Sequence, residues 1–108
     1  MKQKAIMNLL LATSMFMVFS GLAQAAGDAA AVKDKVSMCI GCHEIEGYRT
    51  AYPVLYHVPK IGGQHEAYLL KALGDYKSGA RNHPSMSAIA ATLSEQDLED
   101  FAAYYAGK

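Results

Sequence analysis

Apolar residues recur along the chain at the spacing of helices. Val32, Val36 and Ile40 stand four residues apart, so they form one stripe on a helical surface. Asp28 precedes this stripe and can act as an N-cap, which predicts a helix from Asp28 to about Ile40. No segment alternates apolar and polar residues as a half-buried strand would. The pattern therefore predicts an all-α fold.

Three further helices are predicted toward the C-terminus. One covers residues 64–77, with Gly79 just past it as a C-terminal cap. A short helix over about 87–92 follows. Ser94 then caps the last helix, with Asp97 three residues on in a variant of the capping box. The predicted apolar faces are Leu69, Leu73 and Tyr76, with Leu70 and Ala72 beside them, and in the last helix Leu98, Phe101, Ala102 and Tyr105.

The first 25 residues have a different pattern. Lys2 and Lys4 precede an apolar stretch that ends in the small-x-small triplet 23–25, Ala-Gln-Ala. A basic start, an apolar middle and a small-residue exit predict a secretory signal peptide over 1–25, cleaved near Ala25. The alternative is an uncleaved membrane anchor, for which the apolar run is near the lower length limit. Residues 26–108 are then one domain.

Composition narrows the class of protein further. The chain has 108 residues, 52% of them hydrophobic, with ten basic and ten acidic residues. It is too apolar to be disordered and lacks the basic excess of a nucleic-acid binder. Because Lys2 and Lys4 leave with the signal segment, eight basic residues remain against ten acidic ones, a formal charge of −2. A domain of this size often needs a metal, a disulfide or a cofactor to fold stably.

The run Cys39-Ile40-Gly41-Cys42-His43 predicts a cofactor of this kind. C-x-x-C-H is the attachment signature of c-type haem. Each thiol adds to one haem vinyl group, which gives two thioether bonds, and His43 becomes the proximal iron ligand. The competing interpretations are a redox pair of the thioredoxin kind, a zinc site and a plain disulfide. A redox pair expects a βαβ setting and zinc expects a second ligand pair, and the sequence shows neither.

Met86 is the candidate for the second axial ligand. Haem iron in electron carriers is commonly held by His and Met. After loss of residues 1–25 only Met38 and Met86 remain, and Met38 abuts Cys39 on the proximal side. Met86 follows the turn-rich stretch 82–85, which can carry the chain past the haem edge. The alternatives are a core role for Met86 and ligation by another residue, namely His57, His65 or His83.

Several segments together resemble bacterial class I cytochromes c. They are the C-x-x-C-H run, 59–64 (PKIGGQ), 68–69 (YL), 76–81 (YKSGAR) and 86–105. The chain is similar to the small soluble monohaem type and to one domain of the dihaem carriers, over residues 28–106. The resemblance implies three to five helices wrapped around one covalently bound haem c. It also implies that the first and last helices cross and pack together.

The resemblance further implies two supporting residues. Pro59 matches the proline whose backbone carbonyl accepts a hydrogen bond from the proximal His43. Arg81, in a Gly-x-Arg position, either contacts a haem propionate or is an exposed surface residue. The family often has a glycine in the first helix where it meets the last one, and here residues 29–32 occupy that region.

Residues 44–63 are predicted to be a loop that is rich in aromatic side chains. Tyr48, Tyr52 and Tyr56 are spaced as on a helix, but Pro53 excludes a continuous one. The tyrosines either pack against the protein or line the haem edge, where a hydroxyl can bond a propionate. The sequence leaves both interpretations open.

The function implied is electron transfer without catalysis. The chain is expected to be a monomeric periplasmic carrier that cycles between Fe(II) and Fe(III). It would move electrons from a donor complex or dehydrogenase to a terminal oxidase or reductase, through transient contacts with redox partner proteins. It would not bind nucleic acid and would meet the membrane only through partner complexes. The alternatives are a dedicated cytochrome subunit of a periplasmic dehydrogenase and a haem-based ligand sensor.

Overall fold

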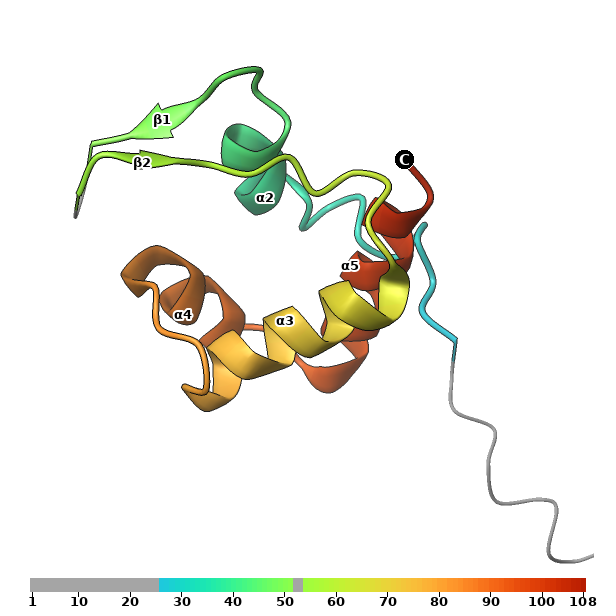
Figure 1. Ribbon diagram of the computed structural model, residues 1–108. Coiled ribbons are helices and arrows are strands. Elements are labelled where there is room, and N and C mark those ends of the chain that lie inside the picture. Colours follow the sequence, from blue (N-terminus) through green and yellow to red (C-terminus); the bar gives the residue numbers. More distant parts are fainter. Residues whose placement is uncertain (1–25, 52–53) are drawn as a thin grey trace, which may run out of the picture.

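The computed structural model describes residues 26–51 and 54–108 (Figure 1). The predicted signal peptide over 1–25 and Tyr52 lie outside the described residues. The described part is mostly helical, as predicted, and adds one small two-stranded sheet. Its elements are α2 (Ser37–His43), β1 (Arg49–Thr50), β2 (Tyr56–His57), α3 (Glu66–Ser78), α4 (Pro84–Ala91) and α5 (Glu95–Ala106).

The first predicted helix is shorter than expected. Between Asp28 and Val36 the chain forms successive turns, and α2 begins only at Ser37. Asp28 still caps the first turn, because its Oδ1 accepts a hydrogen bond from the N–H of Ala30 at 2.8 Å. A bond of the α-helical type appears with the N–H of Val36, which lies 2.8 Å from the carbonyl oxygen of Val32. Of the three residues in the predicted apolar stripe, Val32 and Val36 therefore lie on the turns and Ile40 lies on α2.

Residues 27 and 28, which precede these turns, pack closely against α5. A Cβ at Gly27 would lie 2.1 Å from the carbonyl oxygen of Glu99, so no side chain fits there. The N–H of Asp28 donates to Oδ1 of Asp100 at 2.7 Å, and Nε2 of Gln96 donates to the same oxygen at 2.9 Å. The close approach to the last helix is thus made by a glycine just before the turns. The expected crossing of two regular helices is replaced by turns packed on α5.

The hydrophobic core lies between these turns, α3 and α5. Helix α3 packs against both α4 and α5. Val36 and Cys39 are half-buried and touch both buried clusters, so α2 is joined to the core at its start. The predicted apolar face of α5 is confirmed. One cluster is Val32, Leu93, Leu98 and Phe101, and the other is Leu69, Ala102 and Tyr105.

Helix ends follow the capping residues. The Ser94 hydroxyl accepts from the N–H of Asp97, whose side chain accepts from the N–H of Ser94, so the predicted capping box is confirmed. Gly79 ends α3 in the left-handed region at φ 86°, as its position predicted. Helix α4 begins at Pro84, earlier than the predicted start, because proline fits the first helical position. Met86 therefore lies in the first turn of α4 and not in the loop before it.

Part of the predicted loop 44–63 is a β-hairpin. Arg49 pairs with His57 and Thr50 with Tyr56 in an antiparallel register. Figure 1 shows the hairpin beside α2. The prediction of a loop without strands is wrong here, since strands of two residues are too short to carry an alternating pattern.

Candidate functional site

Helix α2 carries both cysteines and the adjacent histidine. Cys39 and Cys42 are three residues apart on a helix, which places their side chains on the same face. Both are free thiols and both are half-buried. His43 is the last residue of α2 and is likewise half-buried. The sequence motif is thus folded into one short helix that presents both sulfurs together.

The histidine ring is oriented by a backbone carbonyl. Nδ1 of His43 lies 2.6 Å from the carbonyl oxygen of Pro59. Because a carbonyl only accepts, Nδ1 carries the hydrogen and donates it. In the neutral ring this leaves the lone pair of Nε2 free to bind a metal. An arrangement of this kind fixes ring orientation and makes the metal-binding nitrogen more basic.

The thiol of Cys39 is kept protonated by its surroundings. Burial, together with the nearby Cys42 and Glu44, raises the pKa of Cys39 to about 11. A thiol with that pKa is a poor nucleophile for disulfide exchange at neutral pH, which argues against a thioredoxin-like redox pair. Within residues 26–51 and 54–108, no three His, Cys, Asp or Glu side chains converge as a metal cluster.

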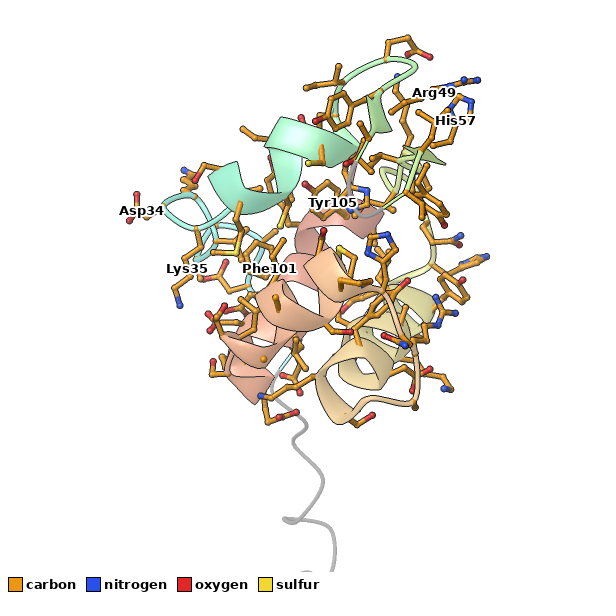
Figure 2. All side chains as sticks on the ribbon, turned by 90° about the vertical axis from the view of Figure 1, so that its left-hand side faces the viewer. Asp34, Lys35, Arg49, His57, Phe101 and Tyr105 are labelled. Carbon is orange, nitrogen blue, oxygen red and sulfur yellow. The ribbon has the colours of Figure 1, made fainter. Side chains whose placement is uncertain are left out.

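Tyr105 belongs to this site, although the sequence pattern placed it only in the core. Its hydroxyl is buried and has no hydrogen-bond partner among the described residues. Burial raises the pKa of Tyr105, and the neighbouring Cys39 and Glu44 act in the same direction. Figure 2 shows Tyr105 near the middle of the molecule. Buried hydroxyls are rarely unpaired, so this one fits a site that a bound group completes.

Met86 lies on a different element from the cysteines. It is half-buried, and its backbone N–H donates to Nδ1 of His83 at 3.5 Å, which caps the start of α4. The two other candidate histidines lie elsewhere. His57 is exposed in β2, and His65 is exposed just before α3. The hydrogen bond from Met86 means that Nδ1 of His83 already has a partner.

Arg81 is held on the surface of α3. Its Nη2 donates to the Tyr68 hydroxyl at 3.2 Å, and its guanidinium carbon lies 5.5 Å from the centre of the Tyr68 ring and 5.7 Å from that of Tyr76. Its Nε is 3.8 Å from Oδ2 of Asp75. These contacts pair the guanidinium with groups of the protein itself. They hold the guanidinium beside α3, and its contact with a haem propionate stays a prediction.

The helical fold and the C-x-x-C-H helix define a haem-binding protein of the cytochrome c class, and sequence comparison agrees. The model of the cytochrome c family matches residues 25–106. The chain therefore belongs to the cytochrome c family, and its cofactor is covalent haem c. The residues present fit that group: two free thiols on one helix face, an imidazole with one free nitrogen, and an unpaired buried hydroxyl.

Three relatives illustrate the similarity of this chain to other bacterial proteins. The chain is 42% identical to cytochrome c4 of Pseudomonas aeruginosa over 97% of its own length and 48% of that protein. It is 38% identical to cytochrome c-554(548) of Halomonas halodenitrificans over 77% of its own length and 99% of that protein. A thiosulfate dehydrogenase electron acceptor of Stutzerimonas stutzeri is 35% identical over 60% of this chain and 29% of that protein.

The lengths of these relatives differ. The chain spans about half the length of the cytochromes c4 of Pseudomonas aeruginosa, Stutzerimonas stutzeri and Azotobacter vinelandii. It spans nearly all of the Halomonas protein, which is therefore a relative of single-domain size. Across the part of the chain that the structure describes, no helix is both long and apolar enough to cross a bilayer.

Proposed function

We propose that this cytochrome c is a periplasmic one-electron carrier in which Cys39 and Cys42 attach the haem and His43 and Met86 are its axial ligands. When bound, haem c supplies the Fe(II)/Fe(III) couple. The chain itself orients the ligands and presents a surface to redox partners. The absence of a vacant axial position would make it a carrier and not an enzyme.

The observation that carries the proposal is the contact between His43 and Pro59. The proton on Nδ1 faces a backbone carbonyl at 2.6 Å, so Nε2 is the nitrogen left to bind iron. The two residues are 16 positions apart, and the hydrogen bond ties the segment after the hairpin to the end of α2. The carbonyl would hold the ring in one tautomer and one orientation when Nε2 binds iron.

Met86 supports the proposal by its place on α4. It is one of two methionines among residues 26–108, and the other, Met38, precedes Cys39 on α2. The first turn of α4 holds Met86 half-buried on an element separate from the cysteine helix. A thioether prefers Fe(II), so ligation by Met86 would give a higher reduction potential than two imidazoles would.

The test replaces each methionine in turn in the haem-loaded protein. Met86→Ala should lose the weak far-red absorption band of a methionine-to-ferric-iron bond, should lower the reduction potential, and should bind CO in the reduced form. Met38→Ala is the matched control, because Met38 is 39% exposed and lies next to the attachment motif. It should retain the spectrum and potential of the parent. A Met86→Ala protein with the parent's spectrum and potential would exclude Met86 as the ligand.

Localisation and partners are part of the same proposal. The predicted signal segment over 1–25 supports export to the periplasm, where c-type haem is attached in bacteria. A mature protein that retains residues 1–25 by mass spectrometry would contradict cleavage. With a formal charge of −2 in residues 26–108, we expect transient partner contacts with a weak salt dependence. We expect the carrier to be a monomer.

A second candidate is a dedicated electron acceptor of one dehydrogenase. The relative from Stutzerimonas stutzeri that bears such a name favours it. Affinity purification of the tagged protein from periplasmic extract distinguishes the two. A dedicated subunit elutes in stoichiometric complex with one dehydrogenase, whereas a free carrier elutes alone and is reduced by more than one donor.

A further inference from the structure

The β-hairpin and helix α4 touch through one pair of rings. The Tyr56 ring in β2 and the His83 ring before α4 have centroids 5.3 Å apart and planes tilted by 56°. Tyr56 is 47% exposed, so burial in the core does not hold its ring. His83 is half-buried. The pair is therefore a contact between two peripheral elements, 27 residues apart in the sequence.

His83 also fixes the start of α4. Its Nδ1 accepts from the N–H of Met86 at 3.5 Å, and its own N–H lies 3.5 Å from the hydroxyl of Ser87. Its carbonyl oxygen accepts from the N–H of Ser87 at 2.8 Å. The ring that faces Tyr56 is thus the ring that caps the turn containing Met86. Both contacts depend on a single side-chain orientation.

We propose that Tyr56 and His83 form a clasp that keeps Met86 in place as the axial ligand. The inference rests on the proposed ligation by Met86. Tyr56 restricts the His83 ring, the ring caps the first turn of α4, and that turn carries Met86. Both are positioning residues, since neither needs to touch the iron. The clasp assigns Tyr56 a role other than packing or contact with a propionate. It also makes His83 a residue that supports the axial ligand, not the ligand itself.

The clasp should control how readily a foreign ligand replaces Met86. For a small ligand such as imidazole to bind ferric iron, the Met86 side chain must leave, and the first turn of α4 must loosen with it. An aromatic pair of this geometry lowers the population of the loosened state by about two- to tenfold. Loss of the ring contact should therefore tighten imidazole binding by that factor and accelerate it in the same proportion.

The experiment measures imidazole binding to the ferric haem-loaded protein by absorption spectroscopy. Tyr56→Ala and His83→Asn should each tighten binding about two- to tenfold. Asparagine keeps a good capping acceptor for α4 but has no ring, so His83→Asn isolates the ring contact. Tyr56→Phe keeps the ring and should match the parent. Leu55→Ala is the surface control, because Leu55 adjoins Tyr56 and is 70% exposed.

The double variant decides whether the two rings act together. In a clasp, Tyr56→Ala combined with His83→Asn binds imidazole as tightly as either single variant, because the contact is already lost. Parent-like binding by Tyr56→Ala, or fully additive effects in the double variant, would overturn the clasp. Met86 ligation would still stand in that case, provided that the parent shows the far-red band. A parent without that band would instead refute the proposed ligation itself, so the two failures are distinguishable.

Discussion

Two regions of this cytochrome c are stabilised in different ways. The helical region, α3 to α5, supplies most of the buried core: Phe101 and Leu98 are each 2% exposed, and Ala102 is fully buried. The attachment region, α2 with the β1–β2 hairpin, has no fully buried residue in any of its elements. Figure 1 shows the two regions side by side. A region without a core of its own must be held by individual contacts and covalent bonds, which we call tethers.

The tethers of the attachment region are few and specific. Cys39 packs against both core clusters. Nδ1 of His43 bonds the carbonyl oxygen of Pro59, in the segment between the hairpin and α3, and Nζ of Lys108, two residues past the end of α5, lies 2.6 Å from Oε1 of Glu44. A covalently attached haem adds two thioether bonds to this set. The comparison teaches that the cofactor is a structural part of the attachment region, whereas the helical region supplies the frame on which it is held.

Removal of the haem attachment should have the largest effect. Cys39→Ser combined with Cys42→Ser deletes both covalent tethers, so we expect amide hydrogen exchange in α2 and the hairpin to accelerate by at least roughly tenfold more than in α3 and α5. The measurement is hydrogen exchange with residue resolution on the parent and the double variant. Equal loss of protection in α2 and α5 would show that the two regions form one cooperative unit.

Gly27→Ala should have the next largest effect. A Cβ there would lie 2.1 Å from a backbone oxygen of Glu99, which cannot move as a flexible side chain would. We expect a loss of about 1–3 kcal/mol in the free energy of unfolding, measured by denaturant titration. Gly74→Ala, in α3 with open space around its Cβ, is the control and should gain about 0.5–1 kcal/mol. A neutral Gly27→Ala would mean that the turns do not depend on α5.

The smallest effect concerns acid stability of the helical region. The pKa of Asp97 is lowered from 3.8 to about 2, first by the hydrogen bond from Lys35 and then by the N–H and hydroxyl of Ser94. Because the folded pKa lies below the unfolded one, this stabilisation is present above the unfolded pKa and is lost as pH falls through the folded one. Asp97→Asn should therefore cost about 1 kcal/mol near neutral pH and less in acid.

Denaturant titrations along a pH series check this prediction. The variant and the parent should converge as pH falls from about 4 to about 2. Asp34→Asn is the matched control, because Asp34 points away from the protein in Figure 2. It should parallel the parent at every pH. A difference between Asp97→Asn and the parent that persists unchanged in acid would assign the loss to packing and not to charge.

The attachment motif and the helix ends were predictable because each depends on a few neighbouring residues. Cys39, Cys42 and His43 carry their chemistry in their spacing alone. Ser94 and Asp97 satisfy each other's backbone and side-chain groups within one turn, and Gly79 is placed by the left-handed conformation that ends α3. The boundaries of two helices were less accurate: α2 begins only after turns that pack on α5, and α4 begins earlier than predicted because Pro84 fits the first helical position.

The sequence by itself therefore determined the C-x-x-C-H motif from which haem attachment is predicted, the small helical domain and the helix caps, all of which follow from short-range pattern. Only the tertiary structure decided which distant groups meet. It placed Gly27 against the backbone of Glu99 and Tyr56 on the ring of His83. The physical reason is that such contacts join residues far apart in the chain, where neither periodicity nor spacing records which partner a backbone carbonyl or a ring will find.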